Sequence, residues 1–145
     1  MSAAKPAAPI TPFAITGIVE RGDQRGRTLG IPTANVTVAR GDTFPDEGVY
    51  AATVTLADGS RHRAAVSIGR RPTFYADGFE LCEAHLLDFS GDLYDQAIDI
   101  VLTHHIRGQV RFDGVDALIA QMRHDCAIVR QTLPPPADPP APAHR

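Results

Sequence analysis

Apolar and polar residues alternate along the middle of the chain, which is the pattern of strands that bury one face. Five such stretches are expected as strands: residues 13–19, 50–56, 64–68, 81–89 and 98–106. Asp58-Gly59 lies between the second and third stretches and predicts a two-residue hairpin turn, because both residues tolerate a positive φ. The last stretch is expected to place four apolar residues on one face: Ile98, Ile100, Leu102 and Ile106.

One helix is predicted at the end of the patterned region. Its apolar residues recur at three- and four-residue spacing: Val115, Leu118, Ile119, Met122, Cys126, Val129 and Leu133. Asp113 is expected to cap the start, with Asp116 three residues on in a capping-box-like arrangement. Five or six sequential strands followed by one helix indicate an antiparallel barrel with the helix packed on it.

The two ends of the chain differ from this region because they are rich in proline and alanine. Such segments favour solvated, extended chain. We therefore expect disordered tails at residues 1–12 and 134–145 around one domain of residues 13–133.

Composition adds few constraints. With 145 residues, 43% apolar content and a net charge of −3, the chain is typical of a soluble globular domain and has no general attraction for nucleic acid or a membrane surface. The two cysteines have no metal-binding spacing, and no apolar run is long enough to span a bilayer. We expect a cytoplasmic monomer without disulfides.

The loop after the first strand is a candidate phosphate-binding segment. Gly22, Gly26 and Gly30 recur every four residues, with Arg25 and Arg27 between them. Backbone N–H groups near glycines can approach an anion closely, and arginine adds charge-assisted hydrogen bonds. The spacing does not fit a Walker A motif, which needs four residues between its glycines and then lysine. A plain inter-strand loop is the alternative.

Pro32-Thr33-Ala34-Asn35 follows this loop. On an extended segment, Thr33 and Asn35 point the same way. Both offer neutral oxygen atoms, which suit a hard cation such as Mg²⁺ that also carries phosphate oxygens and water. Pro32 fixes the approach of Thr33. Taken alone, this pair could equally be part of a turn or of a strand edge.

These residues form part of a longer series that resembles the riboflavin kinase family. The motifs occur in collinear order, and they are residues 26–35, 45–51, 66–74, 83–89, 92–94, 106–107 and 111–113. The resemblance covers Gly17 to Leu133. It implies a mainly β fold, a six-stranded antiparallel Greek-key barrel with a C-terminal α-helix.

The resemblance also implies a function: transfer of the ATP γ-phosphate to the 5′-hydroxyl of riboflavin to give FMN, with Mg²⁺ or another divalent cation. Thr33 and Asn35 would hold the cation, and Glu83 would be the catalytic base. Arg107 and Phe112 would bind the flavin. The nucleotide-binding residues would be Gly22, Gly26, Arg27, Gly30, Pro32 and Thr33.

Two of these assignments, Glu83 and Phe112, have structural alternatives. Glu83 shares a strand face with Leu81 and Leu87, an unusual place for a carboxylate, but it could face solvent or pair with Arg107 or Arg111. Phe112 could be ordinary packing at the edge of the helix.

Three departures from the family pattern lie on the presumed flavin side: Asp95 for glycine, Gln109 for glutamate and Gly114 for serine. They keep open a catalytically altered flavin- or nucleotide-binding module, or a kinase for a different small acceptor. Most bacterial relatives also carry an N-terminal FMN adenylyltransferase domain. The chain is therefore expected to be a stand-alone kinase or a piece of a longer protein.

Overall fold

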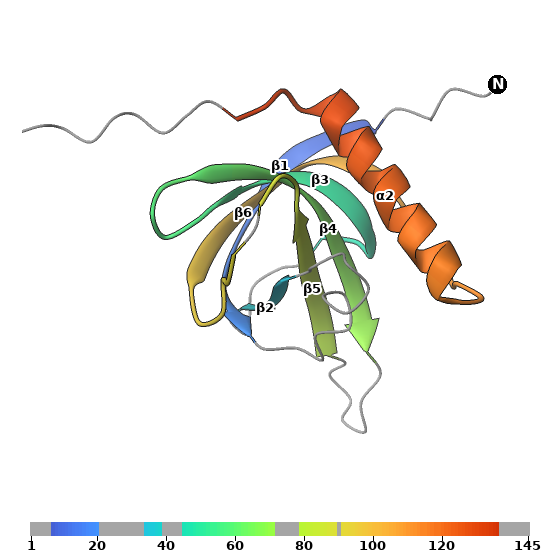
Figure 1. The fold of residues 1–145 in the computed structure, drawn as a ribbon, viewed down its shortest axis with the longest axis horizontal. Coiled ribbons are helices and arrows are strands. Elements are labelled where there is room, and N and C mark those ends of the chain that lie inside the picture. The colour runs from blue at the N-terminus through green and yellow to red at the C-terminus, as the bar shows by residue number, and fades with distance from the viewer. Residues whose placement is uncertain (1–6, 21–33, 39–44, 72–78, 90, 137–145) are drawn as a thin grey trace, which may run out of the picture.

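The fold is a closed barrel with one helix on its outer surface (Figure 1). The computed structural model describes residues 7–20, 34–38, 45–71, 79–89 and 91–136. In this part of the chain the elements are β1 (Ala8–Glu20), β2 (Ala34–Val38), β3 (Gly48–Thr55), β4 (Arg61–Arg71), β5 (Phe79–Leu86), β6 (Ala97–Arg107) and α2 (Val115–Thr132). Neighbouring strands are antiparallel in the order β1-β2-β5-β4-β3-β6, and β6 closes the ring on β1.

The order of the strands makes this a Greek-key barrel. Strands β3, β4 and β5 are consecutive antiparallel neighbours, and β6 returns to lie beside β3. The spatial order β6-β3-β4-β5 is that of a Greek key. The expected mainly β class, six antiparallel strands and C-terminal helix are therefore confirmed.

The predicted hairpin between β3 and β4 is present, although its loop is one residue longer than expected. The backbone N–H of Leu56 donates to the carbonyl of Ser60, which leaves residues 57–59 as a three-residue loop. Gly59 has a φ of 88°, and Asp58 accepts a hydrogen bond from the Ser60 backbone N–H at 2.8 Å. A glycine with positive φ at the last loop position is the usual geometry of such a loop.

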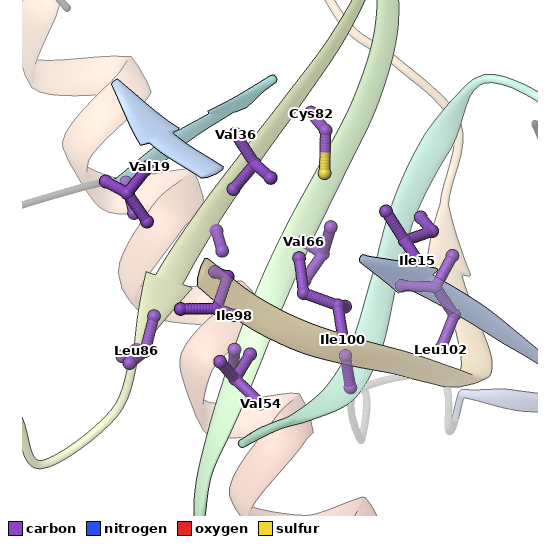
Figure 2. Packing of buried hydrophobic residues seen from close by; sticks show 14 of the residues in the cluster. Ile15, Val19, Val36, Val54, Val66, Cys82, Leu86, Ile98, Ile100 and Leu102 are labelled. Atoms are coloured by element: carbon purple, nitrogen blue, oxygen red, sulfur yellow. The ribbon is translucent and has the colours of Figure 1, made fainter. Parts of the chain in front are cut away.

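Alternate residues of every strand fill the inside of the barrel. Figure 2 shows side chains of this cluster from β1 (Ile15), β3 (Val54) and β6 (Ile98). On β5 the inward residues are Cys82, Ala84 and Leu86. Because side chains alternate along a strand, Glu83 lies on the outer surface of the barrel.

A second apolar cluster joins the outer surface of the barrel to α2, which lies across β3 and β4 (Figure 1). Its buried residues are Val49, Ala51, Ala65, Leu87 and Val129, and Ile106, Cys126 and Leu133 pack against them. The predicted helix stripe is thus only partly correct. Val115 is 49% exposed, whereas Ile128, which the spacing had not selected, is buried.

The prediction for Ile106 was wrong. It packs in the cluster under α2 and not with Ile98, Ile100 and Leu102 inside the barrel. The pairing of β6 with β3 shifts register twice before it reaches Arg107. Such irregularities reverse the simple alternation of faces along a strand.

The predicted helix cap was also wrong. Gly114, and not Asp113, occupies the N-cap position of α2, and that position makes no side-chain capping hydrogen bond. Gly114 is extended, with a φ of 167°, so the helix begins one residue later than an aspartate cap would require.

The expected boundary of the N-terminal tail needs correction, because β1 begins at Ala8. β1 pairs with β2 only over residues 17–20, and its pairing with β6 is irregular between Pro9 and Phe13. Proline has no backbone N–H and is tolerated where a strand lacks a partner on one side or is irregular. Pro9 and Pro12 therefore fit into the strand.

The rest of the predicted tails is described in part. Residues 134–136 follow α2 without regular secondary structure. Residues 1–6 and 137–145 lie outside the described part of the chain, so their expected disorder stays a prediction.

Asp88 connects the end of α2 to the barrel. Its carboxylate accepts two hydrogen bonds from Arg130 at 2.9 Å each and one from Arg63 at 3.2 Å. Arg63 also donates to the carbonyl of Leu133 at 3.2 Å. The hydrogen bonds and positive charge of Arg130, with a further contribution from Arg63, lower the pKa of Asp88 from 3.8 to about 2.

This arrangement predicts an acid-dependent part of the stability. Because the pKa of Asp88 is lower in the folded state, its contribution is present above pH 3.8 and disappears as the pH falls through about 2. Urea midpoints of the wild type and Asp88→Asn should therefore differ at pH 6 and converge near pH 2. Asp113→Asn, at another exposed carboxylate, is the control. A wild-type advantage that persists unchanged at pH 2 would contradict the role of Asp88.

Candidate active site

A row of directly paired residues crosses the outer surface of the barrel. Arg107 on β6 is paired with Val49 on β3, which is paired with Ser67 on β4. Ser67 is in turn paired with Glu83 on β5, and Glu83 with Asn35 on β2. The row ends at Glu20 on β1, the partner of Asn35. Six strands therefore contribute one residue each to a continuous line.

The side chains of this row point outward. Their neighbours along each strand, such as Val36 on β2, Val66 on β4 and Cys82 on β5, belong to the barrel interior. Side chains of directly paired residues lie on the same face, with their Cβ atoms about 5 Å apart. The side chains of Ser67, Glu83 and Asn35 are consequently immediate neighbours, and each is half-buried.

Two of the predicted functional residues are therefore brought together by the sheet. Glu83, the expected base, and Asn35, the expected cation ligand, are separated by 48 positions in the sequence but lie directly opposite each other. The remaining nucleotide and metal predictions fall outside the described part of the chain: Gly22, Gly26, Arg27, Gly30, Pro32 and Thr33.

Arg107, expected to bind flavin, is held by the helix. Its Nε and Nη2 atoms donate to the two carboxylate oxygens of Asp125 at 2.9 and 2.8 Å. Asp125 is 3% exposed and also accepts from Gln121 at 3.1 Å. A buried carboxylate requires such partners. Arg107 therefore forms a bidentate pair that joins β6 to α2.

Arg107 also organises the segment that joins β6 to α2, residues 108–114. Its Nη1 atom donates to the carbonyl of Gly108 at 3.0 Å. Its guanidinium carbon lies 5.9 Å from the centre of the half-buried Phe112 ring, within the range of a cation–π contact. Phe112 thus packs on Arg107 at the start of the helix, next to the end of the row.

Gly48 explains why β3 can come so close to β6 here. It has a φ of 157°, and a Cβ atom on it would lie 2.8 Å from the carbonyl oxygen of Arg107 and 2.9 Å from Nε2 of His105. Any larger residue would push the two strands apart. This glycine therefore helps to place Arg107 and the segment that follows it.

The two cysteines are packing residues. Both are free, and Cys82 is buried inside the barrel. Burial, with a further contribution from the charge of Glu83, raises the pKa of Cys82 to about 12. Burial raises the pKa of Cys126 to about 11. Neither thiol is a nucleophile at neutral pH, because the nucleophilic form is the thiolate.

Comparison with known proteins gives the family. The family model described as "Flavokinase: Riboflavin kinase" matches residues 10–133. The chain belongs to the riboflavin kinase family. A curated relative, the bifunctional riboflavin kinase/FMN adenylyltransferase of Pseudomonas fluorescens, is 40% identical over 126 residues, covering 87% of this chain and 40% of its own length. The chain thus spans about two fifths of that riboflavin kinase relative.

Solved structures share the fold. The riboflavin kinase of Trypanosoma brucei is 25% identical, with a TM-score of 0.59 over 84% of this chain and 80% of its own. A protein described as a macrolide-efflux protein from Streptococcus pneumoniae is 32% identical, with a TM-score of 0.79 over 85% of this chain and 40% of its own. Within the described residues here, no helix is both long and apolar enough to cross a membrane.

Two departures from the riboflavin kinase pattern lie at opposite ends of β6, and not in one region as expected. Asp95 precedes β6, and its backbone N–H donates to the carbonyl of Val19 at 2.8 Å, near the Glu20 end of the row. It has a φ of 67°, so the turn requires a positive φ, which aspartate tolerates better than most residues. Gln109 follows β6, at the Arg107 end.

Ser67, Gln109 and Asp125 are the residues of this region that the sequence did not assign. Gln109 had been noted only as a departure, and Asp125 lies within the predicted helix between the apolar positions. An acidic residue beside the apolar stripe of a helix is the one signal that could have indicated Asp125. Ser67 carries no such signal, because only the strand register brings it beside Glu83.

Removal of one partner of the Arg107–Asp125 pair should be costly. Asp125→Ala leaves the partly buried guanidinium of Arg107 without its carboxylate and should lower the free energy of unfolding by about 3 kcal/mol. Arg107→Met/Asp125→Leu removes both charges and should lose much less. Asp116→Ala, at an exposed carboxylate of the same helix, should change it by about 0.5 kcal/mol. Urea denaturation measures all three; equal losses for the first two variants would contradict the pair's role.

Proposed function

We propose that the protein is a riboflavin kinase, which transfers the γ-phosphate of ATP to the 5′-hydroxyl of riboflavin and releases FMN and ADP. The observation that carries this proposal is the direct pairing of Glu83 with Asn35 on the outer surface of the barrel. It gives a carboxylate that can accept a proton beside a neutral oxygen that can bind a cation. Membership of the riboflavin kinase family supports riboflavin and ATP as the substrates.

Glu83 acts as the general base in this proposal. As the acceptor oxygen forms its bond to the γ-phosphorus, the hydroxyl proton passes to the Glu83 carboxylate, and the bond to the ADP oxygen breaks. A carboxylate in the middle of a paired strand is held in place by backbone hydrogen bonds on both sides. Such fixed placement is what a positioned base requires.

Asn35, together with Thr33, would hold a divalent cation such as Mg²⁺. Among the residues that the structure describes, no group of three or more acidic, histidine or cysteine side chains forms a metal site. A pair of neutral oxygens still fits Mg²⁺, because that ion keeps waters and takes further ligands from substrate phosphates. When bound, the cation neutralises charge on the phosphates during transfer.

The row also separates donor from acceptor. In phosphoryl transfer the attacking and leaving oxygens lie roughly in line on opposite sides of the phosphorus. If the phosphates lie over Asn35, the acceptor must approach Glu83 from the other direction, over Ser67 and towards the segment 108–114. The exposed Val110 and Val115 belong to or adjoin this segment and offer apolar surface to an aromatic acceptor.

Arg107 and Phe112 contribute to this acceptor side as a support. Arg107 donates two N–H groups to Asp125 and one to a backbone carbonyl, so its main action is to hold the segment 108–114 in place.

A kinase for another small acceptor is the second candidate function, because the departure at Gln109 lies on the acceptor side and not on the Asn35 side. The free cysteines agree with action in a reducing cytoplasm.

The direct test is incubation with riboflavin and Mg·ATP, followed by chromatography for FMN. FMN supports the proposal. Flavin binding without FMN would indicate a binding module, and ATP consumption only with another acceptor would indicate a different kinase.

Glu83→Gln should abolish turnover while flavin binding changes little, because the amide keeps the size of the side chain but cannot accept the proton. We expect kcat to fall by a factor of roughly 100 or more, with riboflavin affinity measured by quenching of its fluorescence. Glu47→Gln, at an exposed glutamate before β3, is the control. Near-normal kcat in Glu83→Gln would exclude the assigned role.

Asn35→Ala should raise the Mg²⁺ concentration needed for half-maximal rate, because one neutral oxygen ligand is lost. An increase of roughly tenfold corresponds to one ligand interaction. The matched control is Thr37→Ala, on the same face of β2 two residues further along. A Mg²⁺ titration that does not change would count against a cation at Asn35.

A further inference from the structure

The side-chain amide of Gln109 ties two separate parts of the outer surface together. Its Nε2 atom donates to the hydroxyl oxygen of Ser67 at 2.8 Å and to the carbonyl oxygen of Ile68 at 2.9 Å. Gln109 belongs to the segment that joins β6 to α2, whereas its acceptors are on β4. More than 40 residues separate them in the sequence.

The position of these acceptors is informative. Ser67 is the direct cross-strand partner of Glu83, so the hydrogen bond of Gln109 ends on the residue beside the proposed base. The amide also lies close to Gly69, because a Cβ atom on Gly69 would be 3.7 Å from Gln109 Nε2. The amide therefore lies on the outer surface of β4, over residues 67–69.

The segment 108–114 is consequently held at two points. Arg107 anchors its start to Asp125 of α2 and to the carbonyl of Gly108. Gln109 anchors it to β4, one strand from Glu83. Between these anchors and the helix lie Val110 and Phe112, of which Val110 is 54% exposed. The segment 108–114 would form one wall of the acceptor side, and the two anchors fix its distance from Glu83.

We propose that Gln109 is a positioning residue for the acceptor side of the reaction. By donating to Ser67 and Ile68, it holds the segment 108–114 at a fixed place relative to Glu83, so that an acceptor bound against this segment presents its hydroxyl to the base. The inference rests on the proposed kinase function, and it assigns Gln109 no contact with the substrate.

The chemistry of the side chain supports an amide at this position. The carbonyl oxygen of Ile68 can only accept a hydrogen bond, and the Nε2 group of glutamine supplies two donor hydrogens. The second hydrogen is donated to the hydroxyl oxygen of Ser67. The hydroxyl hydrogen of Ser67 can then donate to another acceptor on the same face. A methionine of similar length would keep the packing but lose both hydrogen bonds.

The first test compares Gln109→Met with Gln131→Met, the same change at an exposed glutamine of α2. Loss of two hydrogen bonds that hold the acceptor wall should raise the KM for riboflavin roughly tenfold, while the KM for ATP changes less than about twofold. The control variant should match the wild type in both constants. An unchanged riboflavin KM in Gln109→Met, or equal increases in the two KM values, would overturn the inference.

The second test asks whether Gln109 acts through Ser67. Ser67→Ala removes one of the two acceptors, so Gln109→Met should raise the riboflavin KM by a smaller factor in that background than in the wild type. Equal factors in both backgrounds would show that the two residues act independently and would overturn this route.

The third readout does not depend on turnover. Backbone amides of residues 108–113 should exchange with solvent several-fold faster in Gln109→Met than in Gln131→Met, because one anchor of the segment is lost. Unchanged exchange would overturn the anchoring. A wild-type protein that forms no FMN would instead contradict the proposed function, and the inference about the acceptor with it. Turnover with an unchanged riboflavin KM in Gln109→Met would overturn the inference alone.

Discussion

Closure of the six-stranded ring is the constraint on which the rest of this structure depends. Because β6 returns to pair with both β3 and β1, every strand has its register fixed on both sides. A shift of one residue would turn Glu83 into the apolar interior and Cys82 to the surface. The alanines and branched residues of the core therefore hold the polar row on the outer surface in place.

Much of the fold could be predicted from the sequence, because the strands bury one face and so alternate. The alternation indicated five of the six strands, but it did not indicate the short β2 (Ala34–Val38) or which of two plausible faces points inward on β5. Leu81, Leu87 and Glu83 share one face in the sequence, and the smaller Cys82 and Ala84 fill the barrel. Ile106 was misplaced for a different reason: register shifts in β6 leave no trace in the apolar pattern.

The candidate site divides in a similar way. Motifs of the family indicated Glu83 and Asn35, and the structure adds that the two are direct partners on neighbouring strands. Their adjacency could not be derived from the sequence, because it depends on a pairing between β2 and β5 that skips β3 and β4. Asp125 and Gln109 were missed because each acts through a hydrogen bond to a residue far away in the sequence.

The position of the candidate site on the outside of the barrel has a physical cause. A barrel of about eight strands has an interior just wide enough to hold one small ligand. With six strands, the interior here is occupied by a continuous apolar core (Figure 2). A small molecule must therefore bind on the outer surface, where the sheet can form only one side of a binding site.

The other sides have to come from segments that leave the sheet, and such segments need anchors that hold them at a fixed distance from it. The Arg107–Asp125 pair and the amide of Gln109 are anchors of this kind for the segment 108–114. These hydrogen bonds stabilise the fold, and they also keep the segment 108–114 at a fixed distance from Glu83.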